Sequence, residues 1–468
     1  MRLEEQKIPT SRVGIGSRLG IAGTAFWFAV PLIVAAAEPF SGVAADPPTA
    51  FGIPFDFILF ALTLLGVALF HHHTLQVALT GLATIVLYKL VFTGFKTGNG
   101  LPGLVSHLAH EWVILSNLLC LLLGFALLSK HFEDSHVPAV LPKYLPGQTK
   151  GAFALLAMVF VMSSFLDNIA AALIGGAMAH TVFRGKVHIG YLAAIVAASN
   201  GGGSGSVVGD TTTTMMWIDG VSPVDVFHAY VAAVIALVVF GIPAALQQNK
   251  YSPLMAYEPG GKHVDWGRVG IVAFILVAAI ATNVYINLVH TEVADHFPFI
   301  GVTVVLAILI STPLRKPAWS LLPGATKGTT FLLALVTCAS MMPVETLPVA
   351  SWQSAMGLGF ISAVFDNIPL TALALKQGGY DWGMLAYTVG FGGSMIWFGS
   401  SAGVALSNMY PDAKNVGRWV HHGWHVVVAY VISFLVLLAV MDWHPGQKRG
   451  DPPVTTSSVA QPPDMPTH

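Results

Sequence analysis

The sequence predicts an all-α polytopic membrane protein of about eleven transmembrane helices in two inverted repeats, each with a re-entrant hairpin and a broken helix. Three observations support this fold class. Only 10% of the 468 residues are charged and 54% are hydrophobic, whereas a soluble domain usually carries about 25% charged residues. Long apolar runs recur along the chain, and two kinds of interrupted apolar segment occur in the same order in both halves.

The uninterrupted apolar runs are the expected membrane-spanning helices, because a span needs about 20 mostly apolar residues. Nine such runs lie at 20–37, 55–71, 75–95, 110–129, 225–247, 268–289, 297–313, 328–346 and 422–441. The first run follows Arg12 and Arg18 and ends in three alanines, which also fits a cleaved signal peptide. We expect a retained helix; cleavage would leave the remaining topology unchanged.

Four further regions are apolar but interrupted by polar residues or glycine. Two contain Asp-Asn-Ile, at Asp167 and Asp366, and are expected to form hairpins over 150–183 and 348–377. Two are rich in glycine and are expected to be broken helices. The expected divisions are a cytoplasmic tail 1–19, N-terminal helices 20–105, a first repeat 106–250 with its broken helix at 188–217, a second repeat 251–442 with its broken helix at 380–409, and a disordered tail 443–468.

The distribution of positive charge supports this arrangement. With the N-terminus cytoplasmic and each hairpin returning to its own side, the chain crosses the membrane eleven times. Of the 22 Lys and Arg residues, 17 then fall inside, four fall outside and Lys89 lies in the membrane. Such a bias is expected for cytoplasmic loops. The first hairpin enters from the cytoplasm and the second from outside, as inverted repeats require.

Three carboxylates, Asp167, Asp210 and Asp366, lie in the interrupted elements. A carboxylate in hydrocarbon costs about 2.5–3.5 kcal/mol on insertion scales, so it needs a reason to be there. Burial favours its protonated form and a bound cation favours its charged form, so such a group can exchange a proton for a cation. The alternative is that each aspartate only caps the N-terminus of a half-helix.

Neutral oxygen donors surround these carboxylates in the sequence. Asn168 and Asn367 follow the repeated aspartates and could coordinate a cation or fix the hairpin tip. Glycine runs indicate unwound backbone that lines a site, although close helix packing is the alternative. The candidate cation- and proton-binding residues are Asp167, Asn168, Ser199, Asn200, Asp210, Thr211, Thr212, Asp366, Asn367, Ser394, Ser400 and Ser401.

Other titratable residues are assigned smaller roles. Glu111 is a candidate for proton access, or alternatively a solvated residue at the membrane interface. Lys89 could pair with Asp56. The histidine tract 71–73 has no nearby cysteine or carboxylate, so no metal other than a transported ion is expected, and no cofactor. No Lys or Arg occurs in the stretches 151–183, 187–249, 328–375 and 377–413. The expected site is therefore acidic, which favours a cation as substrate.

Three segments resemble the NhaD-type sodium/proton antiporters of the ion transporter superfamily: LDNIAAAL, SNGGGSGSVVGDTTTTMMW and FDNIPLTALAL. HEWVILSNLLCLLLGFALLSKHFED is similar to that family's helix before the first hairpin, with Glu111 at its acidic position. The resemblance implies two inverted repeats, commonly in a homodimer, and exchange of sodium or lithium for protons. The superfamily also contains dicarboxylate, citrate and arsenite carriers, so a sodium-coupled anion carrier is the alternative. Carboxylate carriers typically have Ser-Asn-Thr at the hairpin tips, where this sequence has Asp-Asn-Ile.

We therefore expect a secondary transporter of a bacterial inner membrane with a cytoplasmic N-terminus and a periplasmic C-terminus. Its partners would be sodium ions, protons and the lipid bilayer; a net charge of −1 gives no reason to expect nucleic acid. A channel would need a continuous pore, which two hairpins do not suggest. An enzyme would need a nucleophile or metal constellation, and the sequence offers none.

The first testable prediction concerns topology. The loop around Lys250 should be cytoplasmic and the segment after Trp443 periplasmic, because this assignment gives the positive-inside bias. Alkaline phosphatase, which is active only outside the cytoplasm, should be active when fused after Trp443 and inactive when fused at Lys250. A reporter that works only in the cytoplasm, found active on the tail, contradicts eleven crossings.

Overall fold

The computed structural model describes residues 48–70, 73–254, 263–290, 293–294 and 296–448. Within them the chain is almost entirely helical; a short antiparallel ribbon pairs β1 (Thr49–Ala50) with β2 (Ile53–Pro54). Six helical segments of this part are long and apolar enough to cross a membrane: Thr74–Thr93, Gly100–Asp134, Pro223–Tyr251, Trp266–Ile286, Trp319–Ser340 and Trp424–Met441. Shorter apolar helices accompany them. The protein is an all-α, multi-pass membrane protein, as predicted; the apolar run at 20–37 lies outside the described residues.

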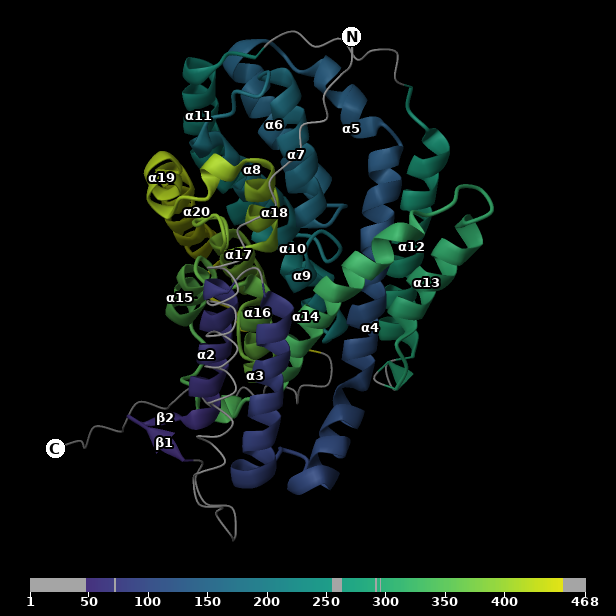
Figure 1. Ribbon diagram of the computed structural model, residues 1–468, viewed down its shortest axis with the longest axis vertical. Coiled ribbons are helices and arrows are strands. Elements are labelled where there is room, and N and C mark those ends of the chain that lie inside the picture. The colour runs from purple at the N-terminus through teal and green to yellow at the C-terminus, as the bar shows by residue number, and fades with distance from the viewer. Residues whose placement is uncertain (1–47, 71–72, 255–262, 291–292, 295, 449–468) are drawn as a thin grey trace, which may run out of the picture.

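Contacts group twelve of the described helices into two bundles (Figure 1). In the peripheral bundle α4 packs against α12, α13 and α14, α14 packs against α3, and α3 packs against α2. Its helices are α2 (Phe55–Leu69), α3 (Thr74–Tyr88, continued by a π-helical turn at Lys89–Thr93), α4 (Gly100–Asp134), α12 (Trp266–Val289), α13 (Phe299–Ser311) and α14 (Leu322–Ser340). In the central bundle α8 packs against α6 and α11, α11 against α20, and α15 against α17. Its helices are α6 (Gln148–Ser163), α8 (Ile189–Ser204), α11 (Ala229–Tyr251), α15 (Trp352–Ser362), α17 (Trp382–Gly392) and α20 (Trp424–Met441).

Four short helices lie at the centre of the molecule, where the sequence predicts breaks: α7 (Asn168–Val182), α9 (Thr211–Ile218), α16 (Asn367–Gln377) and α18 (Ser401–Met409). Helices α6 and α7 form one helical hairpin, and α15 and α16 form the other. A loop separates α8 from α9, and a second loop separates α17 from α18. The remaining short helices are α5 (Val137–Val140), α10 (Pro223–Phe227) and α19 (Val416–His422).

The two hairpin tips have the same local geometry. Asp167 precedes α7 with φ −52° and ψ 139°, and its carboxylate accepts a hydrogen bond of 3.2 Å from the backbone N–H of Ile169. Asp366 precedes α16 with φ −53° and ψ 139° and accepts one of 3.1 Å from Ile368. An aspartate at this position satisfies an N–H group that the helix leaves unpaired. The repeated Asp-Asn-Ile triplet therefore corresponds to a repeated structure.

The broken helices correspond to each other as well. Asp210 caps α9 with φ −141° and ψ 146°, and Ser400 caps α18 with φ −141° and ψ 154°. The preceding helices meet the hairpins through equivalent bonds, because the hydroxyl of Ser163 donates to the carbonyl of Ser199 and that of Ser362 donates to Val389. One half of the molecule, however, has a carboxylate where the other has a hydroxyl.

The hairpins open toward opposite ends of the molecule (Figure 1). Helix α7 contacts α5, which directly follows the end of α4. The last turn of α16 instead contacts α4 near its start, where Lys376 pairs with Glu111. Glu111 and the last residue of α4, Asp134, are separated by about 35 Å along the helix axis.

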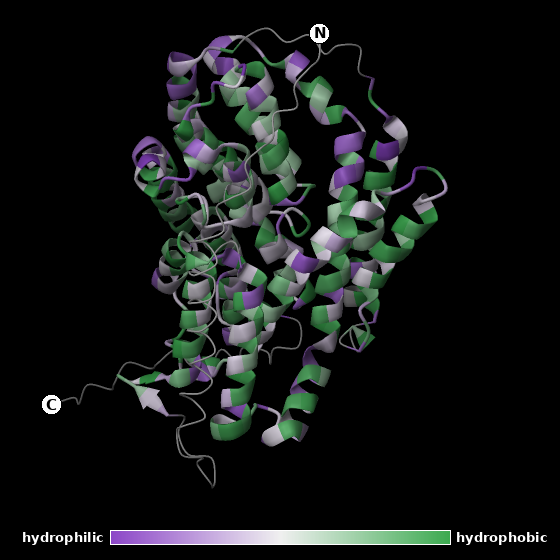
Figure 2. Ribbon diagram, viewed as in Figure 1, coloured by the Kyte–Doolittle hydropathy of each residue, from purple (hydrophilic) through white to green (hydrophobic). Residues whose placement is uncertain are grey.

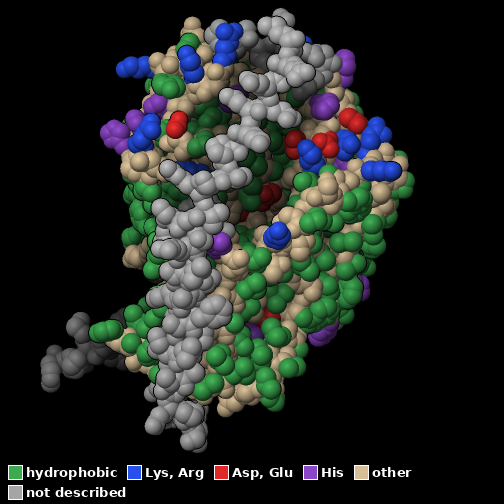
Figure 3. All heavy atoms as spheres, viewed as in Figure 1, with side chains coloured by type: hydrophobic (Ala, Val, Ile, Leu, Met, Phe, Trp, Pro, Cys, Tyr) green, Lys and Arg blue, Asp and Glu red, His purple; other side chains and the backbone are tan. Residues whose placement is uncertain are grey.

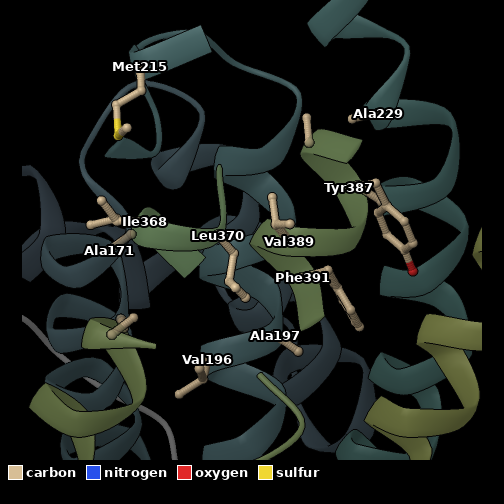
Figure 4. Packing of buried hydrophobic residues seen from close by; sticks show 14 of the residues in the cluster. Ala171, Val196, Ala197, Met215, Ala229, Ile368, Leu370, Tyr387, Val389 and Phe391 are labelled. Atoms are coloured by element: carbon tan, nitrogen blue, oxygen red, sulfur yellow. The ribbon is translucent and has the colours of Figure 1, made fainter. Parts of the chain in front are cut away.

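The apolar residues have two environments. Figure 4 shows buried residues such as Ala197, Leu370, Val389 and Phe391 packing where the central helices cross. Side chains on the outer helices are exposed, as on α12, where Val277 is 64% accessible. Figure 2 shows hydrophobic residues along the helices and hydrophilic ones concentrated toward the upper end. This pattern fits helices surrounded by lipid.

A buried ion pair joins α2 to the end of the helix that follows it. The Lys89 ammonium lies 3.0 Å from the Asp56 carboxylate in a buried ion pair between α2 and the π-helical turn that continues α3, the pairing that the sequence suggested.

The sequence prediction places the start of the disordered tail too early. Residues 443–448 are hydrogen-bonded to the N-terminal end of α17. The N–H of Gly446 donates to Tyr380, and the indole of Trp382 donates to Gly446. Residues 449–468 lie outside the described residues.

The second prediction tests the close crossing of the hairpin and the broken helix. A Cβ at Gly202 would collide with the backbone carbonyl of Phe160, whereas a Cβ at Gly201 would lie 3.4 Å or more from the side chains around it. Gly202→Ala should therefore destabilise the purified protein by about 1–3 kcal/mol, and Gly201→Ala should change it little. Thermal unfolding in detergent measures both. Equal melting temperatures for the two variants would contradict this packing.

Candidate functional site

A cavity of about 200 Å³ lies between the peripheral bundle and the short central helices. Its wall on one side comes from α4 and α14, and on the other from the hairpin tips and broken helices. The polar residues that line it are Asp167, Asn168, Asp210, Thr211, Thr214, Thr329, Asn367 and Ser401. Figure 3 shows acidic side chains deep in a hollow on this face of the molecule.

Asp210 is at the centre of the site, with only 3% of its surface exposed. Its carboxylate accepts hydrogen bonds from the amide of Asn168 at 3.2 Å, the hydroxyl of Thr212 at 2.9 Å and the amide of Asn367 at 3.5 Å. These donors come from both hairpin tips and from the helix that Asp210 caps. The two hairpins therefore meet at one carboxylate, and all of these donors are uncharged.

Asn200 connects the two broken helices. Its side-chain N–H groups donate to the hydroxyls of Ser394 at 3.0 Å and Ser400 at 3.1 Å, and its oxygen accepts from Asn168 at 3.1 Å. It is completely buried, as is Ser394. A hydrogen-bond network thus runs from Ser400 through Asn200 and Asn168 to Asp210.

The other two aspartates lie at the hairpin tips and keep part of their surface exposed. Asp167 lines the cavity. Asp366 accepts a 3.1 Å hydrogen bond from the hydroxyl of Ser401, which lines the cavity in its place. Each aspartate caps its helix, so the capping role considered from the sequence is present. Capping uses one carboxylate oxygen for a backbone N–H, and it does not prevent the carboxylate from binding a cation.

The hydroxyl residues divide into different roles. Thr211 lines the cavity and Thr212 donates to Asp210. The hydroxyl of Thr213 donates to the carbonyls of Ser206 and Asp210, so it stabilises the loop before α9. Ser199, a candidate ligand from the sequence, donates its hydroxyl to Val196 within its own helix. Its side chain belongs to α8 and takes no part in the network around Asp210.

Sequence reasoning missed Thr329, which lines the cavity from α14. It lies at the start of an apolar run, where a threonine gives little signal, because its hydroxyl can bond to its own helix. Glu111 lies away from the cavity. It is 3% exposed and forms a bidentate ion pair with Lys376, with Nζ–Oε distances of 2.7 and 2.8 Å. The solvated alternative for Glu111 is therefore wrong.

The cavity lining carries carboxylates without a compensating cation. No Lys or Arg is among the described residues that line it. A buried carboxylate that has hydrogen bonds but no counter-charge is costly, so a proton or a bound cation would stabilise it. Amide and hydroxyl oxygens next to the carboxylates suit a hard cation.

Possible metal ligands among the described residues are His, Cys, Asp and Glu side chains, and the cysteines also supply thiols. In the described part of the chain, no three or more His, Cys, Asp or Glu side chains are grouped so that they could hold a metal ion. His73 bonds to Gln76 through Nδ1 at 2.6 Å, and the rest of the histidine tract, residues 71 and 72, lies outside the described residues. Cys120 and Cys338 are free thiols.

An alignment over 65 residues shows 40% identity between the chain and part of sodium/proton antiporter 1 from Arabidopsis thaliana. The match covers 12% of this chain and 11% of that protein. No protein-family model matches the chain. The shared segment is too short to assign the chain to a family.

The third prediction separates the neighbours Asn200 and Ser199. Asn200→Ala removes one hydrogen bond from each of three buried partners, Asn168, Ser394 and Ser400, so it should cost about 2–4 kcal/mol of stability. Ser199→Ala removes a hydroxyl that bonds only within its helix and should cost much less. Thermal unfolding of the two purified variants gives the comparison. If Ser199→Ala is as destabilising as Asn200→Ala, the network does not join the two halves as described.

Proposed function

We propose that this chain is a secondary transporter, and not an enzyme, that exchanges sodium or lithium for protons across a bacterial inner membrane. The observation that carries the proposal is the buried Asp210 carboxylate, whose hydrogen-bond partners at the site are neutral. The partial likeness to a sodium/proton antiporter supports it. So does the resemblance of the hairpin and glycine-rich segments to NhaD-type antiporters.

Proton and cation would compete for the same oxygens. With the carboxylates ionised, Asp167 and Asp210 attract a cation to the cavity, and Thr211, Asn168 and Ser401 supply neutral oxygens. Protonation removes the charge that attracts the cation and displaces it. Asp366, through Ser401, extends the acidic region to the second hairpin.

Alternating access follows from the two hairpins in this proposal. We take the halves of the chain as inverted repeats, with the α6–α7 hairpin entering from the cytoplasm and the α15–α16 hairpin from outside. Both hairpins reach Asp210, through Asn168 and Asn367. A movement of either hairpin would therefore change the surroundings of the same carboxylate.

An anion carrier is the competing function. Such a carrier needs fixed positive charge or an excess of hydrogen-bond donors at its site. The described cavity lining has two aspartates and no Lys or Arg. This charge distribution favours a cation as the transported ion.

The fourth prediction tests the exchange directly. Sodium or lithium added to acid-loaded proteoliposomes should collapse the pH gradient without any organic anion present. Apparent sodium affinity should fall as pH falls, since protonated carboxyls bind sodium poorly, and sodium binding should release protons from the purified protein. Asp210→Asn should weaken the exchange strongly, and Asp167→Asn and Asp366→Asn should reduce it severely while leaving folded protein.

Asp412→Asn is a matched control, because Asp412 is an exposed aspartate outside the site; it should transport like the parent protein. Wild-type exchange by both Asp167→Asn and Asp366→Asn would make these residues structural caps only. The anion carrier would be established instead if the pH gradient does not respond to sodium or lithium and labelled citrate, succinate or arsenite is taken up.

A further inference from the structure

Four charged residues meet around the C-terminal end of α16, beside the first third of α4, on the side that the proposed topology places outside. Glu111 of α4 pairs with Lys376 at the last turn of α16. Asp219, directly after α9, pairs with Lys448 at 2.8 Å. The Lys448 ammonium also donates to the carbonyl of Leu375 at 2.6 Å, so the two pairs are joined at the end of α16.

This four-residue group, called the outer cluster below, is largely buried. The side-chain exposures are 4% for Glu111 and 22% for Lys376 in one pair, and 12% and 16% for Asp219 and Lys448 in the other. It has equal numbers of positive and negative charges. Removing one member of a buried pair leaves an uncompensated charge, which is far more costly than losing an exposed pair.

The outer cluster joins the peripheral bundle to the second hairpin and to the first broken helix. Glu111 is on the peripheral bundle, whereas Lys376 is on the hairpin α15–α16 and Asp219 follows the broken helix. Nearby, His107 of α4 bonds to Ser340 of α14 at 2.9 Å. Helix α16 also packs along α14. At this end the second hairpin therefore packs on α14 and is joined to α4 by the Lys376–Glu111 ion pair.

Further along their length, α4 and α14 are separated from the central helices by the cavity. Leu121 and Phe125 of α4, with Ala325 and Thr329 of α14, line the cavity that reaches Asp210. Figure 3 shows the hollow in the upper half of the view, toward the end where Lys and Arg gather. One end of the gap between the bundles is thus open and the other is closed by the outer cluster.

We propose that the outer cluster is the outer gate of the transporter: its ion pairs hold the hairpin α15–α16 on α4 while the site is open toward the cytoplasm, and they separate when the site opens outward. This inference rests on the proposed alternating-access function. Lys376 is a positioning residue in this scheme, because it contacts Glu111 and takes no part in the cavity lining.

Accessibility of a single cysteine tests the gate. Cys120→Ser and Cys338→Ser remove the native thiols, and Ile169→Cys places a reporter in the cavity wall. In oriented vesicles a membrane-impermeant maleimide should label the reporter from the cytoplasmic side and only slowly from outside. Glu111→Gln or Lys376→Met should raise the outside labelling rate about tenfold or more, because each leaves its buried partner unpaired. The charge exchange Glu111→Lys with Lys376→Glu should bring the rate back toward that of the parent.

The matched control is Glu345→Gln, which breaks the exposed Lys96–Glu345 pair, 44% and 64% accessible, at the same end; outside labelling should not change. Asp219→Asn provides a second gate variant if Lys376→Met is not recovered folded, as judged by gel filtration. The proposal is overturned if folded variants label from outside like the parent, or if the parent labels equally from both sides. Labelling needs no ion gradient, so a failure of sodium/proton exchange would be seen separately.

Discussion

A carboxylate enclosed by protein with only neutral hydrogen-bond partners is the constraint on which the rest of the structure depends. Asp210 takes donors from two hairpins and from its own helix. Bringing these groups together requires helices that end inside the membrane, and their free backbone groups must be bonded within the protein. The caps at Asp167, Asp366 and Ser400 meet this need.

The two halves share backbone geometry but not charge. Asp210 and Ser400 occupy equivalent caps, with nearly equal φ and ψ. Asn200 donates to Ser400 and to Ser394, while Asn168, whose amide also donates to Asn200, donates to Asp210. The carboxylate of the network therefore belongs to the first half of the chain, at Asp210. The second half contributes the hydroxyls of Ser394 and Ser400. This asymmetry gives one central acidic group that both hairpin tips contact.

The sequence predicted the helical class, the positions of the breaks and the residues that meet around Asp210, because aspartate and glycine in apolar runs are rare and have direct structural causes. It did not predict the direction in which each side chain points. Ser199 and Asn200 are adjacent and equally polar, yet only Asn200 faces the network, since the position of each around α8 depends on packing. The partner of Glu111 is 265 residues away in the chain. Such pairs depend on tertiary contacts that no local pattern encodes.

Helix α16 connects the two regions that the proposals assign to transport. Asn367 at its first residue donates to Asp210, and Lys376 in its last turn pairs with Glu111. The two residues are separated by about 13 Å along one continuous helix. Pro369 lies in the first turn, where N–H groups have no helical partner, so it does not weaken the helix. A change of charge at Asp210 alters the hydrogen bond from Asn367, and a shift of the helix at that end must also act on Lys376. In the proposed mechanism, occupancy of the site and closure of the outer end are linked through this one helix.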